Sequence, residues 1–438
     1  MMRPTEEFTA GILPGLDLHR FHCSGRPAAE DPRGARMIGA VERNFYEEVP
    51  TGDALDQILD LYGQDRRTYV GVYEAGAEPE TTEPVGTFAS FSKYLQTGSG
   101  REIEGFLISD VTVRSTHRRR GILRAMMRAE LDRAAASGIP VAALSASEAT
   151  IYRRFGFGVA TTRRTVEVDT GGEVALAGPV SGSLRMMEPR DLRDLGPALY
   201  DRAHRQSPGA VGRAAAYSVT ETDTWRSKND GKGTGVLVAV HHDDDGTPRG
   251  YVTYTFTGWD QKVPTVKIGV LVASTAASFR AIWDYLVHLD LIRKVEWGFA
   301  SDDRLLENLL VDPRRVKTTA HADQLWLRIL DVAACLTGRP YHRDGELVLE
   351  VTDPLGHAAG MWRLTVQSGT AVVEERGEAF DDPDLTLDVA ELSSVYLGGV
   401  SAEVLRQAGR ITEHRPGAAA ELTALLAQDR PVFCMTGF

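Results

Sequence analysis

Apolar residues recur along the chain with helical and strand periods in alternation, which predicts an α/β (α+β) protein. Leu55, Ile58, Leu59 and Tyr62 have the spacing of one face of a helix, so residues 53–62 are expected to be an amphipathic helix. Apolar and β-branched runs predict strands farther on, with helices at 122–136 and 148–155. The expected strands of this first region are 68–73, 85–91, 106–113 and 141–145.

The same succession returns over residues 166–322, with strands expected at 237–240, 250–257, 266–271 and 292–300 and a helix at 276–288. From residue 323 the pattern changes to alternating antiparallel strands and short helices. The chain ends in an apolar tail, residues 432–438, which is expected to be buried because exposed apolar surface is costly. Two α/β regions therefore precede a smaller region of antiparallel strands and short helices.

Length and composition narrow the class of protein. A chain of 438 residues exceeds a single ordinary core, so several domains are expected. The net charge of -12 disfavours nucleic acid as a partner and suits a cationic one. Three widely spaced cysteines without a CxxC pair fit a reducing cytoplasm. Residues 1–35 contain four prolines and no signal-peptide pattern, and are interpreted as a flexible N-terminal extension.

The sequence contains no pattern typical of metal binding or of membrane insertion. The eleven histidines lack ligand spacing, so no metal site is predicted. Three consecutive acids at Asp243 are followed by Gly-Thr-Pro, which favours a solvated hairpin turn over a metal site. No apolar run approaches the roughly 20 residues of a membrane span.

The strongest chemical signal is a basic loop between a strand and a helix at residues 111–124. Four arginines between Arg114 and Arg120 precede Gly121, and the helix follows at once. A helix N-terminus offers unpaired N–H groups and partial positive charge, both of which suit a pyrophosphate. Glycine permits close backbone approach, and the arginines add donors for phosphate oxygens. The alternatives are a basic surface turn without a ligand and a nucleic-acid-binding patch, and the order strand, arginine loop, helix disfavours both.

This loop resembles the acetyl-CoA motif of GNAT N-acetyltransferases, Arg/Gln-x-x-Gly-x-Gly/Ala, here Arg118-Arg-Arg-Gly-Ile-Leu123. Leu123 departs from the small residue of the general motif. That departure, the stretch Ser-Glu-Ala-Thr-Ile-Tyr-Arg-Arg-Phe-Gly-Phe-Gly at 147–158 and a final Phe438 are similar to the Eis (enhanced intracellular survival) branch. The resemblance covers residues 36–438.

The resemblance implies tandem GNAT-like domains with mixed sheets and a C-terminal sterol-carrier-like domain. The catalytic GNAT domain is expected at 36–165, a degenerate GNAT-like domain at 166–322, and the sterol-carrier-like α+β domain at 323–438, with its tail reaching the active site. Acetyl-CoA is the implied cosubstrate. The residues implied to hold it are Val111, Thr112, Val113, Arg118, Arg119, Arg120, Gly121, Ile122, Leu123, Arg124, Ser147 and Glu148.

The resemblance also assigns catalytic roles. Tyr152 is the candidate general acid, since a phenol of pKa about 10 is protonated at neutral pH and can donate to the leaving thiolate. The α-carboxylate of Phe438 is the candidate base, and a purely anchoring role for the cationic substrate stays open beside it. Phe45 and Glu47 are expected to supply an aromatic wall and an acid to the substrate pocket.

The leading functional hypothesis is transfer of acetyl from acetyl-CoA to a cationic amine, aminoglycoside-like or polyamine, in a ternary complex. The resemblance implies a homo-hexamer, and the cysteine usage given above predicts a cytoplasmic location. Two alternatives stay open: acetylation of protein lysines in a regulatory role, and an apolar-ligand-binding module whose GNAT site is vestigial.

Overall fold

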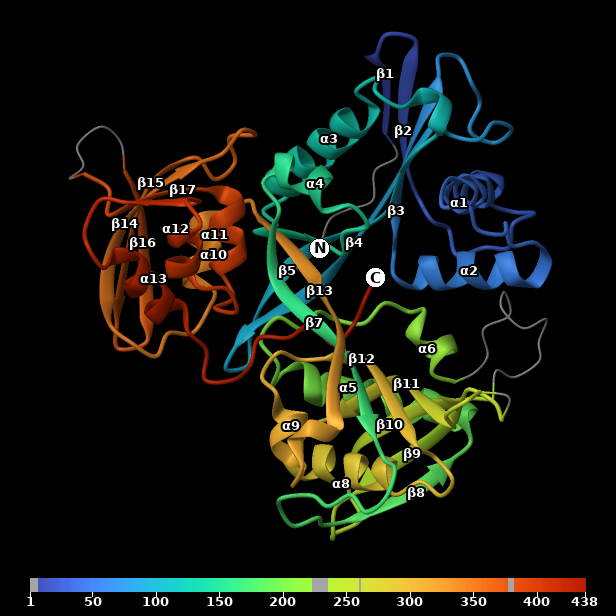
Figure 1. Ribbon diagram of the computed structural model, residues 1–438. Helices are drawn as coiled ribbons and strands as arrows, with labels where there is room; N and C mark the ends of the chain where they lie inside the picture. Colours follow the sequence, from blue (N-terminus) through green and yellow to red (C-terminus); the bar gives the residue numbers. More distant parts are fainter. Residues whose placement is uncertain (1–6, 223–234, 260, 377–381) are drawn as a thin grey trace.

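The chain folds into three regions that meet around its C-terminus, as a computed structural model shows (Figure 1). The structure describes residues 7–222, 235–259, 261–376 and 382–438. One mixed sheet with the strand order β1-β2-β3-β4-β5-β6-β13-β7-β12-β11-β10-β9-β8 runs through the first two regions, and a five-stranded sheet, β16-β15-β14-β17-β18, builds the third. The prediction of mixed sheets followed by an α+β domain is confirmed.

The first region is the N-terminal half of the large sheet with its helices. Helix α3 coincides with the predicted 122–136, because Leu123, Met127 and Leu131 recur on one face against the sheet. Its elements are β1 (Glu7–Leu13), β2 (Leu16–His22), α1 (Pro32–Asn44), α2 (Gly52–Gln64), β3 (Thr68–Glu74), β4 (Gly86–Gly98), β5 (Arg101–Val113), α3 (Ile122–Ala136), β6 (Val141–Leu144), α4 (Ala149–Tyr152) and β7 (Gly158–Asp169).

The predicted flexible extension over residues 1–35 is wrong for residues 7–35. Strand β2 pairs antiparallel with β3 from Leu16 to His22, and its Leu16 and Leu18 are buried in the core beneath α3. Asp31 accepts a hydrogen bond from the Gly34 amide, and Pro32 takes the first turn of α1, so Asp-Pro begins a helix here. Residues 1–6 lie outside the described residues.

The second region repeats the succession of strands and helices of the first. The expected turn at Asp243 is confirmed, since the Asp243 amide donates to the Thr247 carbonyl between β9 and β10. Helix α5 went unpredicted. The elements are β8 (Ser183–Met187), α5 (Leu192–His204), α6 (Tyr217–Thr220), β9 (Leu237–His242), β10 (Pro248–Phe256), β11 (Thr265–Ala273), α8 (Ala276–Val287), β12 (Lys294–Ala300), α9 (Leu305–Leu309) and β13 (Val316–Ile329).

Two long strands exchange between these regions. Strand β7 leaves the first region and pairs with β12 of the second, while β13 leaves the second and pairs with β6 of the first. The two also pair with each other from Val168 opposite Val316 to Gly158 opposite Leu327. The expected boundaries at 165/166 and 322/323 therefore fall inside strands rather than in linkers.

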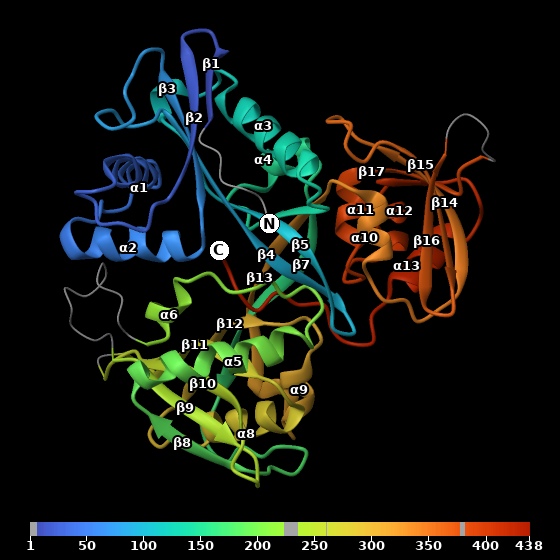
Figure 2. The same ribbon diagram turned by 180° about the vertical axis from the view of Figure 1, so that it is seen from behind.

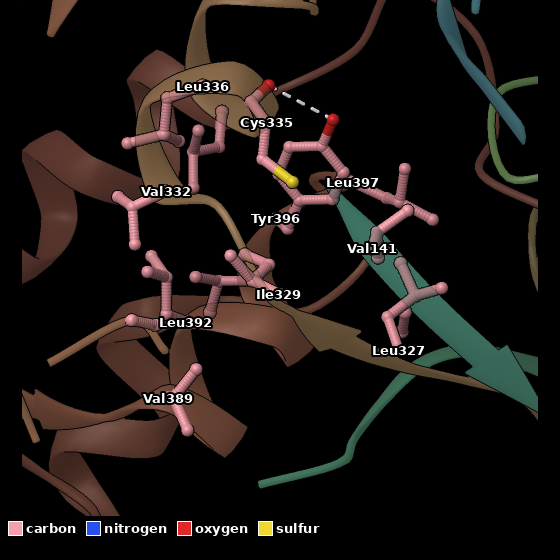
Figure 3. Close-up of a cluster of buried hydrophobic side chains, with 14 of the residues drawn as sticks. Val141, Leu327, Ile329, Val332, Cys335, Leu336, Val389, Leu392, Tyr396 and Leu397 are labelled. Atoms are coloured by element: carbon pink, nitrogen blue, oxygen red, sulfur yellow. Dashed lines mark hydrogen bonds between the residues drawn. The ribbon is translucent and has the colours of Figure 1, made fainter. Parts of the chain in front are cut away.

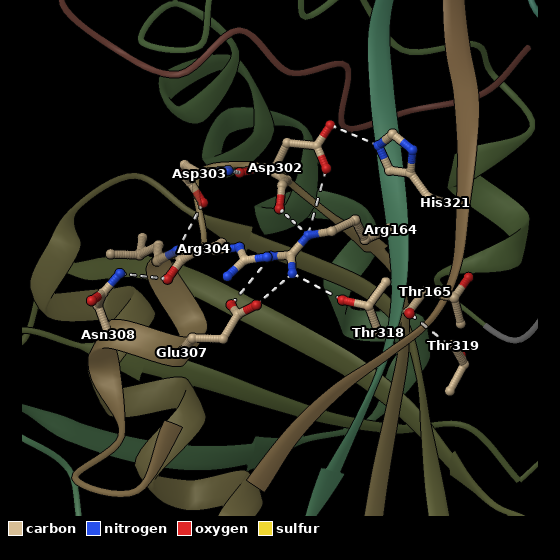
Figure 4. Close-up of polar contacts among 12 residues, drawn as sticks. Arg164, Thr165, Asp302, Asp303, Arg304, Glu307, Asn308, Thr318, Thr319 and His321 are labelled. Carbon is tan, nitrogen blue, oxygen red and sulfur yellow. Dashed lines mark hydrogen bonds and ion pairs between the residues drawn. The ribbon is translucent and has the colours of Figure 1, made fainter. Parts of the chain in front are cut away.

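A polar network reinforces this crossing (Figure 4). Arg164 of β7 donates to Glu307 of α9 at 3.2 Å and to Thr318 of β13 at 3.1 Å. His321 of β13 lies 3.0 Å from the Asp302 carboxylate. The side chains thus tie both long strands to the segment that joins β12 and β13.

The third region packs directly on the first. One hydrophobic core joins Leu107 and Val141 of the large sheet with Leu392 and Tyr396 of the third region. Figure 3 shows this packing, in which the Tyr396 hydroxyl donates to the Cys335 carbonyl at 3.1 Å. The elements are α10 (Val332–Thr337), β14 (Gly345–Thr352), β15 (Gly360–Gln367), β16 (Thr370–Arg376), β17 (Leu385–Asp388), α11 (Val389–Val395), α12 (Ala402–Gln407), β18 (Ile411–Glu413) and α13 (Ala418–Leu426).

A buried ion pair joins the large sheet to the third region. The Arg328 guanidinium of β13 contacts the Asp353 carboxylate at 2.6 Å, and both side chains are fully buried. Nearer the surface, Arg153, which follows α4, contacts Glu391 of α11 at 2.6 Å. Water cannot reach the Arg328–Asp353 pair, so neither side chain can leave its partner and be hydrated instead. The pair therefore holds β13 and the third region in one relative position.

Asp353→Ala is expected to lower the free energy of unfolding by about 3–5 kcal/mol, because it leaves the Arg328 charge buried without its partner. Chemical denaturation followed by fluorescence measures the change. The matched control is Glu188→Ala, whose pair with Arg190 is highly exposed and which should cost less than about 1 kcal/mol. Equal, small effects of both substitutions would contradict the assignment.

Candidate active site

The site begins where two parallel strands part. Strands β5 and β6 pair from Gly105 opposite Val141 to Ile108 opposite Leu144, where β6 ends. Strand β5 continues to Val113, paired with β4 alone along that stretch. The backbone edge of β5 beyond Ile108 therefore has free hydrogen-bonding groups to offer an extended ligand.

A bulge in β5 sits at the parting point. The pairing with β4 shifts between Ala89 opposite Ser109 and Thr87 opposite Thr112, and Asp110 takes a positive φ of 55°. The Thr87 hydroxyl donates to the Asp110 carbonyl at 2.8 Å and so holds the bulge. An extra residue re-aims the following side chains, and Val111 then faces the cavity described below.

The arginine-rich loop joins β5 to the N-terminus of α3. Gly121 occupies the N-cap position with φ of 86° and no side-chain cap, so the first N–H groups of α3 have no capping partner. Arg118, Arg119, Arg120 and Arg124 are exposed, and none forms an ion pair with another residue in the described part of the chain. These groups together provide donors and positive charge beside the open edge of β5.

A cavity of about 380 Å³ lies next to this edge and collects residues from all three regions. Its volume is within the range of small-molecule sites. Figure 1 and Figure 2 both show the C-terminus near one end of α2 and close to α6. The lining residues are Phe45, Tyr62, Arg67, Ile108, Ser109, Asp110, Val111, Leu144, Ser145, Ser147, Tyr152, Ala214, Ala216, Tyr217, Gly437 and Phe438.

Tyr152 ends helix α4 and lines the cavity from the side of β6. Its side chain is 7% exposed and its ring lies edge-on to Phe157 at 6.2 Å. Burial raises the pKa of the Tyr152 phenol above its usual value, while a hydrogen bond with the Ser147 hydroxyl acts in the opposite direction. The phenol therefore stays protonated throughout the neutral range, which is the form that a general acid needs.

The C-terminal tail reaches the cavity across the second region. The Phe433 amide donates to the Pro208 carbonyl at 2.8 Å, and Gln324 donates to the Thr436 carbonyl at 3.0 Å. The Gly437 amide then donates to the Tyr217 hydroxyl at 3.0 Å. Phe438 packs edge-on against Phe91 of β4, with ring centroids 6.1 Å apart. These contacts fix the direction from which the last residue enters the cavity.

A buried charge cluster, which the sequence did not reveal, forms the floor of the cavity. Arg67 lies over the rings of Tyr62 at 3.8 Å and Phe91 at 4.5 Å, and 3.4 Å from the Asp110 carboxylate. Asp65 accepts from Lys93 at 2.8 Å and lies 3.7 Å from Arg67. Burial lowers the pKa of Arg67, but the Tyr62 phenol and the Asp110 and Asp65 carboxylates outweigh it and leave that pKa above its usual value.

Most sequence-predicted residues lie around this cavity or the adjoining loop, with two exceptions. Glu47 is exposed and does not line the cavity, because the turn after α1 directs only Phe45 toward it. The Thr112 side chain bonds Thr87 of β4 at 2.6 Å and Asn44 of α1 at 2.9 Å, so only its backbone remains for a cosubstrate. Glu148 and Ser147 are exposed at the start of α4.

The second region has the same parting of parallel strands but lacks a phosphate loop. Strands β11 and β12 pair from Thr265 opposite Lys294 to Ile268 opposite Trp297. Helix α8 follows β11 closely, and the Thr275 hydroxyl caps its Ser278 amide. The tail residues Phe433 and Met435 line the cavity of about 230 Å³ found there. This crevice therefore holds part of the protein's own tail.

Comparison with known proteins places both regions in one class. Residues 36–160 and 209–329 each match an acetyltransferase (GNAT) domain family, and residues 332–435 match a sterol carrier protein domain family. The parted strands and the loop before α3 belong to the first of these GNAT domains. The protein is thus a GNAT enzyme, an acyltransferase of the class that uses acetyl-CoA.

Whole-chain relatives identify the family. An uncharacterized N-acetyltransferase of Streptomyces avermitilis is 41% identical over 93% of this chain and 97% of its own length. N-acetyltransferase Eis of Mycobacterium tuberculosis is 35% identical over 74% of this chain and 78% of its own. The crystal structure of Eis1 from Mycobacterium abscessus has a TM-score of 0.79 at 30% identity, covering 94% of this chain and 98% of that one. The chain belongs to the Eis family of N-acetyltransferases.

A structure with lower sequence identity shows a similarity in fold alone. A GCN5-related N-acetyltransferase from Anabaena variabilis has a TM-score of 0.75 at 19% identity and covers 99% of this chain and 100% of its own. Among the described residues, the helices are all too short or too polar to cross a membrane.

Replacing Arg120 and Arg124 together by Ala is expected to weaken acetyl-CoA binding by more than about a hundredfold, because each charge-assisted phosphate contact contributes roughly 1.5–3 kcal/mol. Isothermal titration calorimetry at two salt concentrations measures the loss, and the variant should show the weaker salt dependence. The control is Arg128→Ala, one turn farther along α3, where the arginine already pairs with Asp132. Comparable losses in variant and control would contradict the phosphate role.

Proposed function

We propose that the protein transfers the acetyl group of acetyl-CoA to the amino group of a small cationic acceptor in a ternary complex. The observation that carries this proposal is the single cavity in which Tyr152, Val111 at the open edge of β5, and Phe438 meet. The cosubstrate and the acceptor enter from opposite ends: the arginine loop adjoins one end, and α2, α6 and the tail surround the other. The acceptors first proposed are aminoglycoside-like amines and polyamines.

The residues present fit acetyl-CoA. Its pyrophosphate suits the start of α3, which has no side-chain cap, and the arginines of residues 118–124, which form no ion pair within the described residues, since both offer donors and positive charge. Its extended pantetheine arm suits the unpaired edge of β5 between Ser109 and Val113. Backbone N–H groups of that edge are positioned to polarise a thioester carbonyl.

The cationic acceptor first releases one proton to water, and two further protons move in the transfer itself. The neutral amine attacks the thioester carbon, a C–N bond forms, and the C–S bond breaks. Tyr152 donates its phenolic proton to the departing thiolate, for which its raised pKa keeps it protonated. The proton lost by the amine nitrogen goes to the Phe438 carboxylate, directly or through one water, and the tail contacts of Thr436 and Gly437 hold that group in place.

The lysine side chains of proteins also carry a primary amine. Acetylation of protein lysines would therefore use the same mechanism with a different acceptor. The apolar-ligand alternative is disfavoured, because the interior of the third region is filled by side chains such as Leu347, Leu364 and Leu392, each without solvent exposure. We therefore retain amine acetylation as the proposed function.

Tyr152→Phe is expected to lower kcat by about 10²–10⁴-fold while acetyl-CoA binding stays unchanged, because it removes only the proton donor. In the wild type, kcat should not fall between pH 7 and about pH 9.5 through loss of this acid, because its pKa lies above the ordinary value near 10. Thiol release followed spectrophotometrically measures both. Tyr46→Phe, at an 85% exposed side chain, is the control. Full activity of Tyr152→Phe would exclude the assignment.

Deleting Phe438 is expected to lower kcat by about 10²-fold, since it moves the terminal carboxylate back to Gly437, one residue short of its position in the full chain. Phe438→Ala retains a main-chain carboxylate at the same position and should lose less than about tenfold. Measuring kcat and KM for both variants separates the carboxylate from the ring. If the deletion changes only KM, the carboxylate anchors the substrate and is not the base.

A further inference from the structure

A second cavity, of about 390 Å³, lies where the hairpin of β4 and β5 passes the end of helix α5. It shares no lining residue with the candidate active site. Tyr94 of β4 and Glu104 of β5 are opposite each other in the sheet register and both line it, and the Gly212 amide donates to the Tyr94 carbonyl at 3.0 Å. The first and second regions thus build this cavity together, and its volume is within the range of small-molecule sites.

His204, a buried histidine at the end of α5, lines this cavity. Its side chain is 6% exposed, and its ring stacks on that of Tyr200 with the centroids 5.8 Å apart. Within the described part of the chain, its Nε2 atom has no hydrogen-bond partner. A buried polar atom without a partner is costly, so a ligand that donates a hydrogen bond at this place would be stabilised.

The protonation state of His204 suits it to accept such a bond. Burial lowers the pKa of the imidazole, and this is offset only in part by backbone hydrogen bonding and by the Glu102 and Asp201 carboxylates. The ring is therefore neutral near pH 7. A neutral imidazole has a free lone pair on one nitrogen and can accept from an N–H donor.

Negative charge predominates around the cavity. Three carboxylates and two cations line it: Glu102, Glu104, Asp201, Lys93 and Arg205. The Lys93 ammonium contacts the Asp65 carboxylate at 2.8 Å, so a carboxylate outside the cavity already balances its charge. The C-terminal end of α5 adds partial negative charge beside His204. These charges together favour a cation as the ligand.

The arrangement favours an organic cation over a metal ion. Among the described residues, no three His, Cys, Asp or Glu side chains lie close enough to hold a metal ion together. The Tyr94 side chain is 54% exposed at the cavity and offers its ring face to a cation. An organic cation can instead use separate contacts for its charge, its N–H groups and its carbon body.

We infer that this cavity binds a small organic cation with N–H donors, an ammonium, amidinium or guanidinium, independently of the acetyl transfer proposed above. One N–H group donates to Nε2 of His204, the positive charge faces the carboxylates of Glu102, Glu104 and Asp201, and the Tyr94 ring covers the carbon body.

Isothermal titration calorimetry of the full chain with benzamidine at neutral pH tests this site, because benzamidine is a cation with N–H donors. The double variant Glu102→Gln with Glu104→Gln should bind benzamidine at least about tenfold more weakly, since it removes two of the three carboxylates. The matched control, Glu173→Gln with Glu188→Gln, changes the net charge equally at exposed residues outside the cavity and should stay within about twofold.

Two single variants give a second readout. His204→Phe keeps a ring stacked on Tyr200 and removes the acceptor nitrogen, so it should weaken binding at least about tenfold. Tyr94→Ala, at an exposed side chain whose loss leaves the core intact, should weaken binding about 3–10-fold. Circular dichroism of each variant checks that the fold is retained.

Three results would overturn the inference. The first is an unchanged affinity for benzamidine in the double glutamate variant. The second is a loss of binding caused instead by Asp110→Asn, which would place benzamidine in the candidate active site. The third is binding of Zn²⁺ that His204→Phe abolishes while benzamidine does not bind, which would assign a metal ion to the cavity.

Discussion

The pairing of β7 with β13 is the interaction on which the rest of the structure depends. Strand β7 of the first GNAT domain pairs with β12 of the second, and β13 of the second pairs with β6 of the first. The sheet of each domain is therefore complete only with a strand from the other, and the two strands also pair with each other. The third region then packs on β13 and β7 through the Arg328–Asp353 pair and a shared core. Because ladder hydrogen bonds and buried packing fix all three regions together, a tail from the third can end at a set position in the first.

The proposed catalytic cavity follows from that arrangement. The end proposed for the acetyl group is local, since β5, the arginine loop and α4 belong to one domain and are close in sequence. The end proposed for the acceptor is assembled from the residue after α1, from α2, from α6 with the segment before it, and from the tail. The second GNAT domain keeps the parted strands but presents a capped helix and holds Phe433 and Met435 instead of a cosubstrate. In our proposal the first GNAT domain therefore carries the chemistry, while the second holds part of the tail.

The sequence predicted features that depend on neighbouring residues and missed those that join residues distant in the chain. Helix α3 and the loop before it depend on neighbouring residues, and their pattern predicted both. Strand β2 and helix α1 were missed because prolines and histidines masked a strand buried on both faces, although Asp31-Pro32 is a recognisable helix start. Arg67 and Asp110 were missed because their pairing joins residues 43 positions apart whose single identities carry no motif. The exchange of β7 and β13 between the two domains leaves no signal in the hydrophobic periodicity. A strand buries the same side chains whether it pairs within its own domain or with the neighbouring one.

The location of the cosubstrate is the central claim, and hydrogen–deuterium exchange on adding acetyl-CoA tests it most directly. The account predicts slower amide exchange at residues 109–113 and 121–125, where the open edge of β5 and the first turn of α3 lie. It predicts no change at residues 265–278, where β11 leads into the capped helix α8. Protection confined to that second crevice, with none at β5 and α3, would contradict the account.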